Sequence, residues 1–309
     1  LNIKQLMKKN KILIGTRASK LAMIYANQAK YELNKFFSGE IEIVKITTEG
    51  DKNQRDRLKD IGGKGLFSKK IEEELINKKI DLAVHALKDM PSQETPGLIT
   101  NCFLKRNSPE EILITKDNKK FSELNSNSII GTSSFRREFQ LRRIRNDLNY
   151  KIIRGNVDTR ISKLNKNDYD SIILSKAGIK SLKLDHLISE EFSTEKIIPS
   201  AGQGIVSIQC RKDDDDIINL LSKVNDKVSS ISALSERKVL SILEGDCHTA
   251  VGVFSKVNNN NFEISGELFS IDGKKRYFKT IKDIPSNFLK ASEEIGNYLK
   301  AEAKDTYKK

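Results

Sequence analysis

The sequence has 309 residues and a formal net charge of +13, with 37% hydrophobic and 31% charged residues. No apolar run approaches the roughly 18–20 residues that a membrane span requires, and the apolar part of the basic stretch 1–15 is too short for a signal peptide. The composition therefore predicts a soluble globular protein of two or three domains without a membrane partner. The three widely spaced cysteines, Cys102, Cys210 and Cys247, favour reduced thiols in the cytoplasm over disulfides or a metal site.

Strand and helix signals alternate in the first half of the chain. We expect strands at 11–15, 40–46 and 80–84 and helices at 18–37 and 66–79, with a polar, glycine-containing loop at 47–65. The pattern restarts near residue 110, with strands expected at 110–115, 128–131, 151–155 and 171–175. This alternation predicts two α/β lobes, each with a mostly parallel sheet that is covered by helices.

The two halves share a short repeated sequence pattern. The stretches "LIGTRAS" (13–19) and "IIGTSSF" (129–135) each place a glycine turn and hydroxyl residues before a helix. Such hydroxyls are ordinary N-caps, but helix N-termini also attract anions. The arginines beside both turns, Arg17, Arg136 and Arg137, favour anion binding.

The last third of the chain has a different character. The stretch 197–211 contains Pro199, Gly202 and Gly204 and is typical of a crossing back between lobes. From about residue 227 we expect a helix, a turn that carries Cys247, strands at 250–257, 262–271 and 275–281, and a final helix at 286–304. These signals predict a small α+β domain.

The arginines are concentrated, whereas the lysines are spread along the chain. Seven of the 14 arginines lie between Arg136 and Arg160. The planar guanidinium suits bidentate binding of carboxylates or phosphates, so the cluster indicates a discrete anion site. Nucleic acid is the other partner that a charge of +13 allows, although no DNA- or RNA-binding motif is present.

Two stretches could carry chemistry. In "VHALKDMPS" (84–92), His85, Lys88 and Asp89 follow a buried strand, where open α/β sheets bind ligands. A carboxylate there could stabilise a cation or exchange a proton, or it could be a solvated turn residue. In "ILEGDCHTAVG" (242–252), Cys247 stands on a polar turn, which is a poor place for a purely structural thiol.

Taken in order, the motifs resemble one family, hydroxymethylbilane synthase, also called porphobilinogen deaminase. The resemblance covers about residues 12–252 and rests on eight stretches: "IGTRASKLA", "GGKGLFSKKIEEEL", "DLAVHALKDMPS", "GTSSFRREFQL", "RGNVDTRISKL", "SIILSKAGIKSL", "PSAGQGIVSIQCR" and "LEGDCHTAVG". It implies a transferase of tetrapyrrole biosynthesis that joins four porphobilinogen molecules head to tail, releases ammonia and finally releases hydroxymethylbilane.

The resemblance also implies the site. It implies a dipyrromethane cofactor that is bound through a thioether to Cys247, and a catalytic carboxylate at Asp89. Further cofactor- or substrate-binding residues are implied on both lobes and on the glycine-rich loop: Arg17, Ser19, Lys64, Phe67, Lys88, Thr132, Ser134, Arg136, Arg137, Arg154 and Arg160. The chain departs from the family at Lys20, Tyr25, Ala86 and Ser181, the last of which replaces a basic residue that is found in some relatives.

The implied fold is α/β: two periplasmic-binding-protein-like (type II) lobes with a hinged cleft, and a small α+β C-terminal domain. The implied domains are 1–104 with 199–222 (lobe one), 105–198 (lobe two) and 227–309. We expect a cytoplasmic monomer, or one in an organelle stroma, that binds no metal and hands its product to uroporphyrinogen-III synthase. The rival interpretations are a non-enzymatic solute-binding protein of the same lobed fold and a nucleic-acid-binding protein.

Overall fold

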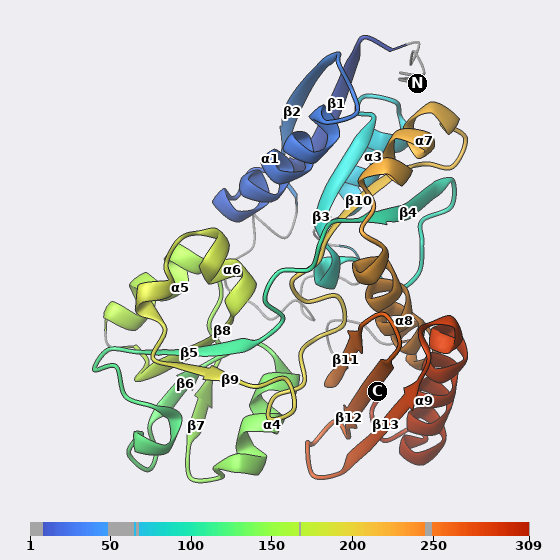
Figure 1. Cartoon of the computed structure of the whole chain (residues 1–309). Helices are drawn as coiled ribbons and strands as arrows, with labels where there is room; N and C mark the ends of the chain where they lie inside the picture. Colours follow the sequence, from blue (N-terminus) through green and yellow to red (C-terminus); the bar gives the residue numbers. More distant parts are fainter. Residues whose placement is uncertain (1–8, 49–64, 66–67, 167, 245–248, 309) are drawn as a thin grey trace.

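The computed structural model describes residues 9–48, 65, 68–166, 168–244 and 249–308, which form three regions (Figure 1). Two regions each contain a five-stranded sheet, and the third contains a three-stranded sheet. No helix in these ranges is long and apolar enough to cross a membrane. The α/β class, with two lobes and a small α+β domain, is thus confirmed.

Lobe one is built on a sheet with the strand order β2-β1-β3-β10-β4. Its strands are β1 (Lys11–Arg17), β2 (Glu40–Ile46), β3 (Leu82–Ala86), β4 (Leu98–Phe103) and β10 (Val206–Arg211). β1 pairs in parallel with β2 and β3, whereas β10 runs antiparallel to β3 and β4. Helices α1 (Lys20–Asn34) and α7 (Asp215–Val224) pack on one face, and α3 (Lys69–Ile76) packs in a second core.

Lobe two repeats this arrangement with the order β7-β6-β8-β5-β9. Its strands are β5 (Glu111–Thr115), β6 (Ile129–Gly131), β7 (Asn149–Lys151), β8 (Ser171–Ser175) and β9 (Glu190–Phe192). Helix α4 (Phe135–Ile144) shares one core with the sheet, and α5 (Val157–Asn165) and α6 (Lys176–Ser181) share another. In both sheets the fourth strand, β10 or β5, directly follows a segment that crosses between the lobes, 193–205 or 104–110.

The third region packs two helices against an antiparallel sheet. Helices α8 (Lys227–Leu243) and α9 (Phe288–Ala303) enclose a core with β11 (Val251–Val257), β12 (Phe262–Phe269) and β13 (Arg276–Asp283). Short 3₁₀ turns occur at Leu87–Asp89 (η2), Phe121–Glu123 (η3), Asp185–Leu187 (η4) and Pro285–Asn287 (η5).

One buried carboxylate joins the third region to both crossing segments. Glu236 of α8 is fully buried and accepts hydrogen bonds from Arg106 Nη1 at 2.6 Å, the Gly202 backbone N–H at 2.7 Å and the Ser255 N–H at 2.9 Å. Arg106 lies in the outgoing crossing segment and Gly202 in the returning one. The Glu236 side chain thus holds both crossing segments against helix α8.

The expectation of mostly parallel sheets was wrong, because β10 and β5 each run antiparallel to both of their neighbours and make the two sheets mixed. Two expectations about local structure were also wrong. The strand expected at 151–155 lies at Asn149–Lys151 instead, because side chains take the next carbonyls: the Tyr169 hydroxyl donates to Ile152 O at 2.7 Å, and the Ser133 hydroxyl donates to Ile153 O. The two glycines of the repeated pattern, Gly15 and Gly131, are strand residues rather than turn residues.

Close packing explains both glycines. A Cβ on Gly15 would lie 2.3 Å from Ile80 Cδ1, and one on Gly131 would lie 3.0 Å from Ile172 Cγ2. Each glycine therefore allows a neighbouring isoleucine to pack against the strand.

Candidate active site

Asp89 ends the 3₁₀ turn η2, which directly follows β3. The returning segment holds this turn in place: the Leu87 N–H donates to Ile205 O at 3.0 Å, and Leu87 packs on Gly202, where a Cβ would come within 2.7 Å. Gly202 also has a φ of +72°, which L side chains rarely adopt. Asp89 is half-buried and forms no ion pair with a described residue.

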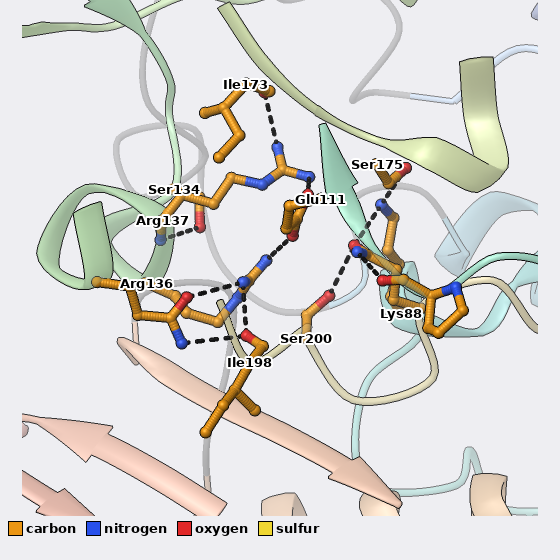
Figure 2. A network of polar contacts seen from close by, with 12 residues as sticks. Lys88, Glu111, Ser134, Arg136, Arg137, Ile173, Ser175, Ile198 and Ser200 are labelled. Carbon is orange, nitrogen blue, oxygen red and sulfur yellow. Dashed lines mark hydrogen bonds and ion pairs between the residues drawn. The ribbon is translucent and has the colours of Figure 1, made fainter. Parts of the chain in front are cut away.

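Lys88 reaches from the same turn toward lobe two. Its Nζ donates to Ser175 Oγ, at the end of β8, and to Gln203 Oε1, in the returning segment, each at 3.2 Å (Figure 2). Burial, followed by repulsion from Arg137, lowers the pKa of Lys88 from 10.5 to about 8, although Asp89 and Glu111 oppose the shift. The ammonium is thus a weakly solvated cation that bridges the two lobes.

In lobe two, Glu111 lies between two arginines. Its carboxylate pairs with Arg136 at 2.5 Å and Arg137 at 2.7 Å, and all three residues are buried (Figure 2). Burial alone would raise the pKa of Glu111, but Arg137 and Arg136 lower it to about 2. Glu111 therefore stays ionised and fixes both guanidinium groups.

The two arginines have different surroundings. Arg136 Nη1 donates to Ile198 O at 2.8 Å and Gln140 Oε1 at 3.3 Å, so its guanidinium is held at the junction with the returning segment. Arg137 Nη1 donates to Ile173 O at 3.2 Å. Its buried Nε has no hydrogen-bond acceptor among the described residues.

Arg160 of α5 adds another cation beside Asp89. Its Nε donates to Gly155 O at 2.8 Å. Burial, followed by repulsion from Arg137 and Arg154, lowers the pKa of Arg160 to about 10, while Asp89 opposes the shift. Asp89 thus lies within electrostatic reach of Lys88 and Arg160, and Arg160 lies within reach of Arg137 and Arg154.

The hydroxyl residues of the two repeated stretches, 13–19 and 129–135, accept hydrogen bonds from nearby backbone N–H groups. Ser19 Oγ accepts from the Ala22 N–H at 3.3 Å, and Ser134 Oγ accepts from the Arg137 N–H at 3.4 Å. Thr132 Oγ1 accepts from the Ser134 N–H at 3.1 Å. Arg17 is the last residue of β1, and its charge helps burial to lower the pKa of His85 to about 4.

Three predicted site residues, Lys64, Phe67 and Cys247, lie outside the described residues. Sequence reasoning missed three others: Glu111, Ser175 and the fully buried Gln203. Glu111 could have been found as a charged residue that opens an apolar strand close in sequence to the arginine cluster. The other two had no comparable signal. Cys102 and Cys210 are buried and free, as expected, and the described part of the chain has no cluster of metal-ligating residues.

The cations suit a group that carries several carboxylates. The orphaned Arg137 Nε and the lowered pKa values of Lys88 and Arg160 show cationic groups that would gain from an anion. A dipyrromethane with carboxylate side chains fits such a site.

Family models cover most of the chain. Residues 12–219 match the porphobilinogen deaminase dipyrromethane cofactor-binding domain, and residues 230–305 match the porphobilinogen deaminase C-terminal domain. The chain belongs to the porphobilinogen deaminase family.

Curated porphobilinogen deaminases match along nearly their whole length. The chain is 40% identical to a Staphylococcus epidermidis porphobilinogen deaminase over 97% of this chain and 98% of the relative. It is also 40% identical to the Bacillus subtilis porphobilinogen deaminase, over 87% of each. The resemblance predicted from the motifs is thus confirmed, together with the transferase activity and the dipyrromethane cofactor of this family.

Solved structures of other proteins match less well. A methionine-binding lipoprotein of Bacillus subtilis matches with a TM-score of 0.42 and 12% identity, over 70% of this chain and 91% of that one. A periplasmic sulfonate-binding protein of Methylobacillus flagellatus matches with a TM-score of 0.40 and 16% sequence identity, over 76% of this chain and 72% of that one. We draw no conclusion from these two matches.

Proposed function

We propose that the chain is a hydroxymethylbilane synthase that condenses four porphobilinogen molecules, releases ammonia at each step and releases linear hydroxymethylbilane by hydrolysis. The observation that carries this proposal is the position of Asp89 beside the partly buried cations Lys88 and Arg160, in a chain that family models cover from residue 12 to 219 and from 230 to 305. The solute-binding alternative is not favoured.

The chemistry explains why one carboxylate lies among cations. Porphobilinogen carries an acetate, a propionate and an aminomethyl group, and loss of ammonia leaves an electron-poor methylene-pyrrole cation. Asp89, which forms no ion pair with a described residue, is suited to stabilise that cation and to hydrogen-bond the pyrrole N–H groups.

The cationic residues are proposed to bind the carboxylates. Arg137, Arg154, Arg160 and Lys88 support this role through their mutual electrostatic effects. Arg17, Ser19, Thr132, Ser134 and Arg136 are proposed as further contacts or as groups that hold the contacting residues. Lys64 and Phe67 are proposed as contacts from the glycine-rich loop.

Cys247 is proposed as the attachment point of the cofactor. When bound, the dipyrromethane supplies the terminal pyrrole to which new units are added. Arg137 and Arg160 would hold its carboxylates, and Lys88 would bridge it to both lobes. The family model that matches residues 12–219 supports the cofactor itself, and Cys247 lies within the range 230–305 that matches the C-terminal family model.

We also propose the domain division 1–104 with 199–222, 105–198 and 227–309, which the strand membership of the three sheets supports. The free buried thiols Cys102 and Cys210 support a reducing compartment, the cytoplasm or an organelle stroma. We propose a monomer that hands its product to uroporphyrinogen-III synthase and does not bind nucleic acid.

The experiment combines turnover with intact mass. Purified protein that was expressed with porphobilinogen available is incubated with porphobilinogen, and ammonia and hydroxymethylbilane are measured. We expect turnover and a mass increase of two pyrrole units, together with colour in Ehrlich's reagent. The Cys247→Ser variant should fold but carry no pyrrole. A bare wild-type protein that does not consume porphobilinogen would refute the proposal.

A further inference from the structure

Two glycines place the side chain of Gln203 in the interior. Gly202 and Gly204 have φ values of +72° and +83°, and a Cβ on Gly204 would lie 2.6 Å from Asn107 O. These left-handed conformations turn the returning segment sharply, and the Ile205 N–H donates to Gly202 O at 3.1 Å. Gln203 lies between the two glycines and is fully buried. A buried amide needs partners for both its donor and its acceptor.

Each polar group of Gln203 meets a different part of the chain. Its Nε2 donates to Pro109 O in the outgoing crossing segment at 2.7 Å, and its main-chain carbonyl oxygen accepts from Arg106 Nε at 2.9 Å. Its Oε1 accepts from Lys88 Nζ at 3.2 Å and from Ser200 Oγ at 3.5 Å. Gln203 thus connects both crossing segments with the lysine of the η2 turn.

The other acceptor of Lys88 is also a neutral group. Ser175 Oγ, at the end of β8 in lobe two, accepts from Lys88 Nζ at 3.2 Å (Figure 2). Lys88 forms no ion pair with any residue that the structure describes, and the nearby Glu111 pairs with two arginines instead. An amide oxygen and a hydroxyl fix the ammonium by their dipoles, so its charge is not neutralised by a hydrogen-bond partner.

The charged groups around Lys88 have opposing effects. Burial has the largest effect and lowers the pKa of Lys88 to about 8. Arg137 and Arg136 on α4 lower this pKa further. Asp89 on the same turn and Glu111 on β5 raise it. A carboxylate in place of either neutral acceptor would add a direct ion pair and raise the pKa.

We propose that Gln203 and Ser175 are positioning residues for Lys88: two neutral acceptors that hold its ammonium between the lobes and leave its charge for a carboxylate of the ligand. This inference rests on the proposed function, since porphobilinogen is taken as the ligand that carries the carboxylates. Because Gln203 also binds Pro109 O, it ties the position of the ammonium to the outgoing crossing segment.

The first arm of the test replaces the amide with a carboxylate of the same size. In Gln203→Glu we expect the titration midpoint of Lys88 to rise by at least about one pH unit, since an adjacent opposite charge favours the ammonium. NMR of the lysine Cε signals against pH measures the midpoint in the purified protein, and Lys88→Arg assigns the signal. At pH 7 we expect KM for porphobilinogen to rise about three- to tenfold, with kcat within about threefold of the wild type, because the neutralised ammonium binds a carboxylate less well.

Gln28→Glu is the matched control. Gln28 lies on α1 and is exposed, so the same substitution adds the same charge at a position that does not contact Lys88. The midpoint and KM should both keep their wild-type values.

Ser175→Asp is the second arm, and it decides the question if Gln203→Glu does not fold. Ser175 is the N-cap of α6 and its side chain makes no capping hydrogen bond, and aspartate is favoured at N-caps. This variant also leaves the hydrogen bond from Gln203 to Pro109 O in place. We expect the Lys88 midpoint and KM to rise, as in the first arm.

Two results would overturn the inference: a Lys88 midpoint that neither variant raises, or a KM that stays at the wild-type value in both. A merely structural role would lower the thermal stability of the variants without moving the midpoint. The NMR titration does not depend on turnover. A wild-type protein that does not consume porphobilinogen would refute the proposed function, whereas an unmoved midpoint would refute the role of the two acceptors, so the two failures are distinguishable.

Discussion

The two lobes share a strand order but use their carboxylates differently. In lobe two, Glu111 is fully buried and pairs with both Arg136 and Arg137. In lobe one, Asp89 is half-buried and has no ion pair among the described residues. The comparison teaches that one carboxylate holds the arginines of lobe two, whereas the other has the surroundings that the proposed function needs for a charge facing a cationic intermediate.

The strongest test of this comparison is to remove the structural carboxylate. Glu111→Gln leaves two buried guanidinium groups without their anion, so we expect a loss of about 3–5 kcal/mol in the free energy of unfolding at neutral pH. Urea denaturation measures this loss. Glu138→Gln is the control: Glu138 forms a surface pair with Arg142 on the same helix as the two arginines, and its loss should cost no more than about 0.5 kcal/mol.

The pH dependence of stability follows from the same carboxylate. The pKa of Glu111 is lowered from 4.5 to about 2, so its contribution is fully present above 4.5 and disappears as the pH falls toward 2. Denaturation between pH 6 and pH 3 should show a smaller loss of stability in Glu111→Gln than in the wild type. Equal pH slopes in the two proteins would contradict the assignment.

The second test removes the available carboxylate. Asp89→Asn keeps the shape of the side chain and removes its charge, so we expect kcat to fall by a factor of about 10²–10³ with little change in stability. Turnover of porphobilinogen measures kcat, and intact mass should show that pyrrole attachment largely survives. Asp305→Asn, at an exposed position, is the control. Retained activity in Asp89→Asn would contradict the comparison.

A smaller effect is expected at Lys88. The pKa of Lys88 is lowered to about 8, so the ammonium loses its proton as the pH rises from 7 to 9, and we expect kcat/KM to fall by up to about tenfold. Lys88→Arg should keep its charge and remove this alkaline limb. Lys180→Arg, at an exposed position of α6, should keep the wild-type profile. A wild-type profile in Lys88→Arg would show that another group titrates.

Sequence reasoning predicted the elements well where the local pattern decides the structure. The alternation in 40–46 and the buried run expected at 80–84 correspond to strands at Glu40–Ile46 and Leu82–Ala86. The strand expected at 151–155 was displaced because the Tyr169 and Ser133 side chains bind its carbonyls. Those partners are 17 and 20 residues away, so no local pattern could reveal them.

The site was predictable by residue type but not by pairing. The arginine cluster and Asp89 were interpreted from residue type as an anion site with a carboxylate, and the structure places Arg160 within electrostatic reach of Arg137, Arg154 and Asp89. That Glu111 pairs with Arg136 and Arg137 depends on the packing of elements that are distant in the sequence.

The position of β10 has a consequence for synthesis on the ribosome. β10 inserts between β3 and β4, although the whole of the second sheet, from Glu111 to Phe192, precedes it in the chain. A nascent chain can thus complete the second sheet while the first still lacks an internal strand. The N-terminal lobe is expected to mature after lobe two, and a nascent chain stalled before Val206 should expose the β3 and β4 edges to chaperones.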